Sequence, residues 1–246
     1  MLERFKFSMR ALQVLSRTQE TVSNNLANIN TAGFKKDKLF FHSFQNQVSG
    51  QQTNEIQMNQ MINITPGEFK QTGNPFDLAI EGDGFFRVEK DGEMFMTRSG
   101  RFHLDNRGFL RDENNAYVMG ENGAVFIPEV LDSNLENEDV VMQIAKDGTV
   151  RVNEEKVDKV QLVKVDDLQN LNRQTNSYFS AAEGTEIKTD LKSTVNQGFF
   201  ETGNIDPMEE MGTMMTTMRL FESQQRAMKT MDDVVGQATR NLGNFQ

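Results

Sequence analysis

Several residue types are absent or rare in this chain of 246 residues. It has no cysteine and no tryptophan, and only four prolines and two histidines. The lack of cysteine excludes disulfide bonds, thiolate metal sites and cysteine nucleophiles. No apolar run is long enough to form a membrane-spanning helix, so we expect no direct insertion into a membrane.

Charge is distributed unevenly along the chain. Residues 1–40 carry a net charge of +4, residues 41–206 carry −13 and residues 207–246 carry −1. The acidic middle of the chain argues against nucleic acid as a partner. The first ten residues contain no continuous apolar segment and no small-residue cleavage site, so we expect no cleaved secretory signal.

Sequence motifs of common enzymes are also missing. The chain contains no G-x-S-x-G, P-loop or H-E-x-x-H motif. His103 alternates with apolar neighbours and is interpreted as a residue on the surface of a strand. Acidic turns at 81–84 and 105–108 lack the spacing of an EF-hand, and none of the 36 acidic residues stands out as a glycosidase pair. We therefore predict no catalytic residue, no cofactor and no bound metal.

The last part of the chain predicts a long amphipathic helix from Pro207 to Leu242. Asp206 is suited to cap its start and Gly243 to end it. About 35 residues, each rising roughly 1.5 Å, give a rod longer than a compact domain normally needs, so we expect this helix to have a partner. Its apolar seam, with alternating steps of three and four residues, consists of Met211, Met214, Met218, Phe221, Met228, Val235 and Leu242.

A second amphipathic helix is predicted over residues 3–29. An Asn-rich run from Asn24 to Gly33 ends it, because Asn and Gly tolerate the left-handed backbone found at helix ends. A basic helix lying on a membrane surface is the alternative interpretation, but the polar face here is mostly uncharged. The apolar ladder of the predicted helix consists of Phe5, Leu12, Leu15, Val22, Leu26 and Ile29.

A polar tract follows, in which ten of the nineteen residues from 45 to 63 are Asn or Gln. Such a composition provides few side chains for a core. Two interpretations remain open. The tract is either a disordered linker or an extended arm that becomes ordered only against a neighbouring subunit.

Residues 66–165 predict an antiparallel meander of short strands. Apolar and aromatic runs alternate with turns such as Asp91-Gly92 and Asn122-Gly123, which favour hairpins. We expect residues 170–182 to form a loop and residues 188–200 to hold one or two further strands. The strands predicted in the meander are 78–80, 85–88, 94–96, 102–104, 117–119, 125–127, 140–144, 150–152 and 160–165.

The predicted fold class is α+β. Long N- and C-terminal helices would pair as a coiled-coil-like stalk, and an antiparallel β-rich domain would be inserted between them. The predicted domains are a discontinuous helical domain of residues 1–34 and 205–246, an extended linker or arm of residues 35–65, and a β-rich domain of residues 66–204.

Three separated segments resemble one protein family. Residues 24–35 (NNLANINTAGFK) are similar to the signature of the bacterial flagellar axial proteins, the rod and hook group. Residues 77–86 (DLAIEGDGFF) and 97–102 (TRSGRF) resemble the start of the β domain in that group. Residues 198–206 (GFFETGNID) and 218–222 (MRLFE) resemble its C-terminal pattern. The length is similar to that of proximal or distal rod members with one inserted β domain.

The resemblance implies a structural subunit of the basal-body rod, a tubular drive shaft that crosses the periplasm, transmits torque and conducts exported subunits. It implies partners among copies of the same chain, other rod and hook subunits, and the flagellar export apparatus, with export that needs no cleaved signal peptide. We expect the subunit interface to include Phe5, Leu12, Leu15, Val22, Asn24, Asn25, Leu26, Asn28, Asn30, Gly33, Phe34, Met211, Met214, Met218, Phe221, Met228, Val235 and Leu242.

Two alternatives stay open. The chain could be another axial component, either a hook-type subunit or an adaptor that caps growth. From a different class, it could be a soluble carbohydrate-acting enzyme or binding module whose terminal helices brace a β domain. A ligand cleft on the β domain would favour this last alternative.

Overall fold

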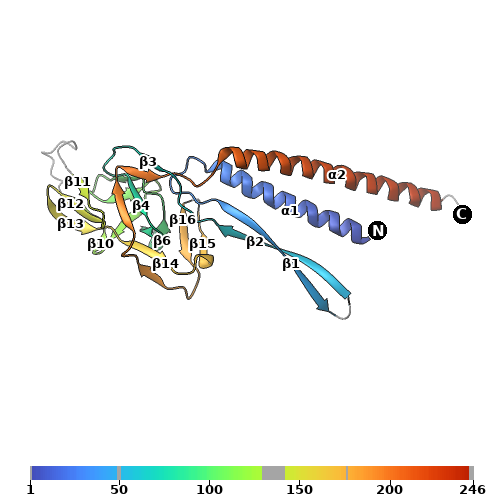
Figure 1. Ribbon diagram of the computed structural model, residues 1–246, viewed down its shortest axis with the longest axis horizontal. Coiled ribbons are helices and arrows are strands. Elements are labelled where there is room, and N and C mark those ends of the chain that lie inside the picture. The colour runs from blue at the N-terminus through green and yellow to red at the C-terminus, as the bar shows by residue number, and fades with distance from the viewer. Residues whose placement is uncertain (1, 49–50, 129–141, 176, 244–246) are drawn as a thin grey trace. The chain divides into compact units, whose positions relative to one another are not determined.

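The computed structural model describes residues 2–48, 51–128, 142–175 and 177–243, and the chain divides into two compact units. The helical unit consists of Met1–Ala27, Asp37–Met61 and Asp206–Gln246, and the β unit consists of Asn28–Lys36 and Ile62–Ile205. The fold is α+β, as predicted (Figure 1). Residues 28–36 group with the β unit, although the predicted boundary placed residues 28–34 with the helices.

Two long helices, α1 (Leu2–Ala27) and α2 (Pro207–Gly243), lie side by side in the helical unit (Figure 1). They run in opposite directions (Figure 1). The end of α1 lies beside the start of α2, where Asn25 donates a hydrogen bond to Glu210. In the part of the chain that the structure describes, neither helix is long and apolar enough to cross a membrane.

The predicted cap of α2 is confirmed. Oδ1 of Asp206 accepts hydrogen bonds from the backbone N–H of Met208 at 2.9 Å and of Glu209 at 3.3 Å. These are donors that a helix leaves unpaired in its first turn. At the other end, α2 includes Gly243, which is the last residue described there.

The polar tract forms paired strands. β1 (Asp37–Val48) and β2 (Gln51–Ile62) make a two-stranded sheet (Figure 1). The interpretation of the tract as a disordered linker is therefore wrong for the described residues. Pairing satisfies the backbone N–H and C=O groups of a polar segment without requiring a large apolar core. The other interpretation, an arm ordered by a neighbouring subunit, stays a prediction.

The β unit is built from short strands whose described pairings are all antiparallel. These strands are β3 (Phe69–Gln71), β4 (Leu78–Glu81), β5 (Phe85–Lys90), β6 (Glu93–Thr97), β7 (Phe102–Leu104), β8 (Leu110–Asp112), β9 (Tyr117–Gly120), β10 (Gly123–Ala124), β11 (Met142–Ile144), β12 (Thr149–Val152), β13 (Glu155–Lys159), β14 (Leu162–Val165), β15 (Leu171–Arg173), β16 (Tyr178–Ala181), β17 (Ile187–Thr189), β18 (Thr194–Gln197) and β19 (Phe199–Glu201). The helix η2 (Leu168–Asn170) precedes β15.

The largest sheet has the strand order β15-β16-β6-β5-β9-β8-β7. β14 pairs with both β5 and β17, and β10 pairs with β9. Smaller sheets join β11-β12-β13, β18-β4 and β19-β3. Strands close in sequence pair through the hairpin turns that the Gly-containing dipeptides predicted: Asp91 and Gly92 both have positive φ angles, 54° and 83°.

The strand predictions differ from the structure at several places. The predicted strands of the meander do not include β3, β8, β10 or β13. Residues 125–127 are not a strand; β10 ends at Ala124, and Phe126 makes only an isolated bridge to Phe109. Residues 170–182, predicted to be a loop, contain β15 and β16, because β16 pairs with the distant β6 and local composition carries no sign of that partner. Residues 188–200 contribute to three strands, not one or two. The first two residues of the predicted strand 140–144 lie outside the described part of the chain.

The beginning of strand β5 is buried on both faces. Phe86 and Val88 belong to the large apolar cluster on one side, whereas Phe85 belongs to a second cluster on the other. β14 divides in the same way, with Leu162 in the first cluster and Val163 in the second. Successive side chains of a strand point to opposite faces, so a strand covered on both sides reads as a continuous apolar run.

Gly33 is the left-handed residue that ends the Asn-rich run. Its φ is 63°, and its backbone N–H donates to the carbonyl oxygen of Glu201 at 2.7 Å. A Cβ atom added at this position would overlap the backbone of Arg98 and Ser99. Glycine meets both requirements at once, since it has no Cβ and adopts positive φ without strain.

Replacing Gly33 should therefore lower the free energy of unfolding by more than the strain of a positive φ alone would. Gly73 provides the matched control, because its φ is 73° but an added Cβ would meet nothing within 4 Å. We expect Gly73→Ala to lower the free energy of unfolding of the β unit by about 1 kcal/mol, and Gly33→Ala by roughly 3 kcal/mol or more. Urea unfolding followed by tyrosine fluorescence tests this, since Tyr117 and Tyr178 both lie in the β unit. Equal losses in the two variants would contradict the steric argument.

Candidate functional site

Two stripes of side chains run along α2. The inner stripe is buried or half-buried, with alternating steps of four and three residues, and consists of Glu210, Met214, Thr217, Phe221, Gln224 and Met228. The methionine stripe is exposed and consists of Met208, Met211, Met215 and Met218. It is displaced from the inner stripe by one residue, which is a rotation of about 100° around the helix. α2 therefore presents two faces with apolar side chains, of which one is covered.

The seam predicted for this helix is divided between the two stripes. Its inner members are Met214, Phe221 and Met228, and its exposed members are Met211, Met218 and Val235. The side chain of Leu242 lies outside the described residues. Three- and four-residue steps fit both stripes, so the sequence pattern could not separate them. Packing within the helical unit decides which face is covered.

Helix α1 contributes a stripe of its own. Ser8 and Val22 are buried, and Leu12, Leu15 and Leu26 are half-buried at intervening steps. Phe5 and Phe7 are exposed by 39% and 69%. The helix pair also leaves an apolar hollow of about 360 Å³, lined by Phe7, Arg10, Ala11, Val14 and Leu15 of α1 and Leu220, Ser223 and Gln224 of α2. The two helices therefore leave apolar surface uncovered on both.

Asn25 fastens three elements of the helical unit together. Its amide nitrogen donates to the Asp37 carbonyl at 3.0 Å and to Glu210 Oε2 at 3.4 Å, and its amide oxygen accepts from the Asp37 N–H at 3.0 Å. The side chain is buried, as is that of Asn28 in the β unit. Asn24 and Asn30 are exposed. The Asn-rich run thus combines asparagines that are buried, such as the hydrogen-bonded Asn25, with asparagines whose side chains are exposed.

A buried group of charges lies inside the β unit; we call Lys35, Arg98 and Glu201 the anchor cluster. Nζ of Lys35 lies 2.5 Å from Oε1 of Glu201, and the nearest Arg98 nitrogen lies 3.5 Å from Oε2. The backbone N–H of Gly67 also donates to Glu201 Oε1 at 2.8 Å. The Lys35 and Glu201 side chains have no exposed surface. Charges buried this deeply persist only when they are paired and hydrogen-bonded.

Burial lowers the pKa of both cations in the anchor cluster, and the Glu201 carboxylate acts in the opposite direction. Backbone carbonyls accept further hydrogen bonds: Lys35 donates to Thr65 at 2.9 Å, and Arg98 donates to Gly82 at 2.6 Å, although the buried Nε of Arg98 has no hydrogen-bond partner among the described residues. The cluster has no open face towards solvent, so its geometry suits fastening and not catalysis. It joins the chain that follows α1 to the chain that precedes α2.

Two further side chains, those of Arg173 and Asn204, hold the same chain segments within the β unit. The Arg173 guanidinium lies 4.6 Å from the centre of the buried Phe34 ring and donates to the Lys35 carbonyl. The Asn204 side chain accepts from the Lys36 N–H at 2.7 Å and donates to the Asn63 carbonyl at 2.8 Å. Of the predicted interface residues, Asn28, Gly33 and Phe34 are buried in this region.

The sequence did not single out the residues that complete this region, which are Arg98, Arg173, Glu201 and Asn204. Three of them lie inside the motif segments 97–102 and 198–206. A charged residue within an apolar motif, such as Glu201 after two phenylalanines, was the available signal. Its partners are more than a hundred residues away in sequence, so no local pattern could pair them.

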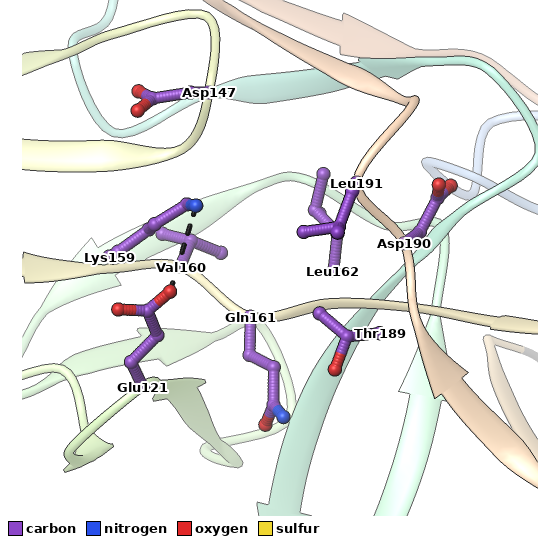
Figure 2. A pocket seen from close by; sticks show the side chains of 9 residues that line it. All are labelled: Glu121, Asp147, Lys159, Val160, Gln161, Leu162, Thr189, Asp190 and Leu191. Atoms are coloured by element: carbon purple, nitrogen blue, oxygen red, sulfur yellow. Dashed lines mark ion pairs between the residues drawn. The ribbon is translucent and has the colours of Figure 1, made fainter.

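Two hollows in the β unit bear on the carbohydrate-acting alternative. One has a volume of about 160 Å³, and its lining includes the exposed Leu191. Glu121 and Lys159, which also line it, form an ion pair at 3.6 Å, drawn as a dashed line in Figure 2. The other, of about 540 Å³, is lined in part by His103 and Asp105. In both, the charged groups pair with protein neighbours and do not converge on a common point. Among the described residues, no three His, Cys, Asp or Glu side chains are grouped to hold a metal.

Asp190, on the rim of the smaller hollow, is held by its own turn (Figure 2). Its carboxylate accepts from the Ser193 hydroxyl and from the backbone N–H of Lys192 at 2.9 Å. Burial raises the pKa of Asp190, but these hydrogen bonds outweigh burial and hold the pKa below its usual value. The carboxylate of Asp190 therefore binds a proton more readily in the unfolded chain than in the native protein. The resulting stabilisation is present above about pH 4 and is lost as pH falls through the native pKa.

We expect Asp190→Asn to make the acid dependence of stability shallower. Below about pH 4 the free energy of unfolding of the variant should fall less per pH unit than that of the wild type, because one carboxylate no longer takes up a proton on unfolding. Urea unfolding at several pH values, followed by tyrosine fluorescence, measures the slope. Asp233→Asn, which removes an exposed carboxylate of α2, serves as the control. An unchanged slope for Asp190→Asn would contradict the assignment.

Burial of the anchor cluster leads to a further prediction about stability. Glu201→Gln leaves Lys35 and Arg98 buried without their anion, and we expect a loss of roughly 3–5 kcal/mol in the free energy of unfolding of the β unit. Glu113 is the matched control, since it pairs with Arg101 at 3.3 Å while half of its side chain is exposed. Glu113→Gln should cost less than about 1 kcal/mol. Similar losses for both variants would show that burial does not govern the cluster.

Three family models match separate parts of the chain. "Flagella basal body rod protein" matches residues 5–35, "Flagellar hook protein FlgE/F/G D1 domain" matches residues 79–152, and "Flagellar basal body rod FlgEFG protein C-terminal" matches residues 196–241. Together these ranges contain α1 with the Asn-rich run, much of the largest sheet, and Glu201 with most of α2.

Known proteins are similar over nearly the whole length. The flagellar basal-body rod protein FlgF of Mesorhizobium japonicum is 28% identical over 242 residues, covering 96% of each chain. FlgF of Caulobacter vibrioides is 28% identical over 237 residues and covers 94% of each. The flagellar basal-body rod protein FlgG of Buchnera aphidicola subsp. Schizaphis graminum is 27% identical, covering 93% of this chain and 95% of its own.

Proposed function

This chain belongs to the flagellar basal-body rod family and is a structural subunit of that rod, and from this premise we propose that it polymerises through its two terminal helices into a tubular drive shaft. The family is a structural one and not a family of enzymes. The location is the flagellar basal body, where the chain assembles with other rod or hook subunits.

The methionine stripe is the observation that carries the proposal. Met208, Met211, Met215 and Met218 form an apolar face on a helix whose other apolar face is already used inside the helical unit. An exposed apolar face of this kind is typical of a protein–protein contact, and a neighbouring subunit would bury it. Methionine suits such a contact because its flexible thioether adapts to neighbours that are not identical.

We assign different tasks to the two stripes. The inner stripe pairs α2 with α1 as a coiled-coil-like stalk within one subunit, and the methionine stripe contacts the helices of neighbouring subunits. The exposed Phe5 and Phe7 of α1 extend this contact surface. Head-to-tail contacts that do not close into a ring produce a helical polymer.

The anchor cluster gives the proposed shaft its stiffness. Torque that reaches a rod subunit must pass between its chain segments without unfolding them. Lys35 and Glu201 lie close to the two points, after Lys36 and after Ile205, where the chain enters the helical unit, and they are joined directly inside the β unit. A buried ion pair resists separation because opening it exposes uncompensated charge to a low dielectric.

Further details of the proposal follow the family. We propose export through the flagellar export apparatus without a cleaved signal peptide, and a rod position that crosses the periplasm. The exposed members of the predicted interface of α1 and α2 remain interface residues in this proposal: Phe5, Asn24, Met211, Met218 and Val235. The inner-stripe members Met214, Phe221 and Met228 instead pack within one subunit. Phe34, Gly33 and Asn28, which are buried in the β unit, act there as fastenings.

Charge on the methionine stripe tests the assembly proposal. We expect Met218→Glu to abolish polymers seen by electron microscopy of concentrated protein, because a carboxylate cannot be buried unpaired in an apolar contact. Tyrosine fluorescence and helical circular dichroism of the variant should match the wild type, since Met218 is exposed in the single chain. Phe221→Glu, in the inner stripe, should reduce helicity as well.

Thr216→Glu is the matched control for this experiment. Thr216 is exposed and lies only two residues from Met218, but on the polar side of the helix. This variant carries the same added charge and should still assemble. Polymers formed by Met218→Glu, or loss of assembly in Thr216→Glu to the same extent, would overturn the assignment of the methionine stripe.

A further inference from the structure

Methionine is the residue type that leaves this chain open to oxidation. The chain has 15 methionines but neither cysteine nor tryptophan. Their exposure differs widely: Met208 and Met215 are 78% and 60% exposed, whereas Met96 and Met142 of the β unit are 2% and 4% exposed. Oxidants act first on accessible sulfur. The two most exposed of these methionines therefore lie with Met211 and Met218 on the methionine stripe of α2, while Met9, Met61, Met94 and Met231 are exposed elsewhere.

We propose that the methionine stripe is an oxidation site, and that conversion of its thioethers to sulfoxides prevents assembly of the subunit. The second half of this proposal rests on the assembly role proposed above. The oxidant is a hydroperoxide such as hydrogen peroxide. One peroxide oxygen is transferred to the methionine sulfur, which loses two electrons, and the remaining oxygen leaves as water.

The change in chemistry acts directly on the contact. A thioether is apolar and flexible, whereas a sulfoxide carries a strong hydrogen-bond acceptor on the same side chain. Within the apolar contact of two helices, that oxygen would be buried without a donor. Met211, Met215 and Met218 follow one another at helical spacing, so successive oxidation makes one continuous face polar.

The same geometry limits when oxidation takes place. In the single chain all four sulfur-bearing side chains are exposed. In the proposed rod a neighbour covers them. Subunits waiting to assemble are therefore sensitive, and subunits already in the rod are protected. An oxidising environment would stop rod growth without damaging finished shafts.

A competition experiment tests the proposal on the full chain. The protein is treated with hydrogen peroxide until about half of the exposed methionines are oxidised, is allowed to assemble, and is separated into pellet and supernatant. Peptide mass spectrometry then gives the sulfoxide fraction at each methionine. Met94, on β6 of the β unit, is the internal control, because the residue is 44% exposed, about as much as Met211 and Met218.

We expect sulfoxide at Met208, Met211, Met215 and Met218 to be several-fold lower in the pellet than in the supernatant, and sulfoxide at Met94 to be equal in both. Met96 and Met142 should remain unoxidised. Equal sulfoxide fractions at the four stripe positions in pellet and supernatant would overturn the inference. Oxidation of the four that is no faster than that of the buried pair would overturn it as well.

A variant with leucine at the four stripe positions separates this inference from the proposed function. Leucine keeps the volume and the helical preference of methionine but has no sulfur to oxidise. We expect the variant to assemble equally well with and without peroxide. If untreated wild-type protein does not assemble, the proposed function fails. If it assembles and peroxide leaves its assembly unchanged, only the oxidation inference fails.

Discussion

The buried pairing of Lys35 with Glu201 is the contact on which the organisation of this chain depends. The chain passes between its two units four times, after residues 27, 36, 61 and 205. Lys35 precedes the second of these crossings and Glu201 precedes the last, and their side chains meet at 2.5 Å in the interior of the β unit. Arg98, which follows β6, adds a second cation. The β unit thus holds together the two segments that lead into β1 and into α2.

The surroundings of this pair explain several other features of the sequence. Gly33 needs both its positive φ and its missing side chain so that the chain can pass against the backbone of Arg98. Asn204 and Arg173 use their polar side chains to satisfy backbone groups of the same passage. Buried polar groups of this kind are costly when they lose their partners, so conformations that separate them are disfavoured.

The helical unit follows a different physical rule, since its apolar surface exceeds what two helices can cover. An inner stripe with polar members at Glu210 and Thr217 packs within the unit, while a purely methionine stripe stays outside it. A domain that folds for itself would place its most apolar stripe inside. The reverse order here is consistent with a helix that makes a second contact, as we propose for this rod subunit.

The sequence by itself determined the two long helices, the cap at Asp206, most hairpin strands and the family, because these depend on local periodicity, turn chemistry and short motifs. It could not determine that the polar tract pairs as β1 and β2, because an Asn- and Gln-rich segment lacks the apolar alternation typical of a strand. Nor could it determine that β16 pairs with β6, because these strands are distant in the chain. Only the tertiary structure decided which stripe of α2 is covered and that Lys35, Arg98 and Glu201 share one site. Seam positions with equivalent helical spacing differ only in what packs against them, and charges more than a hundred residues apart meet only once the chain has folded.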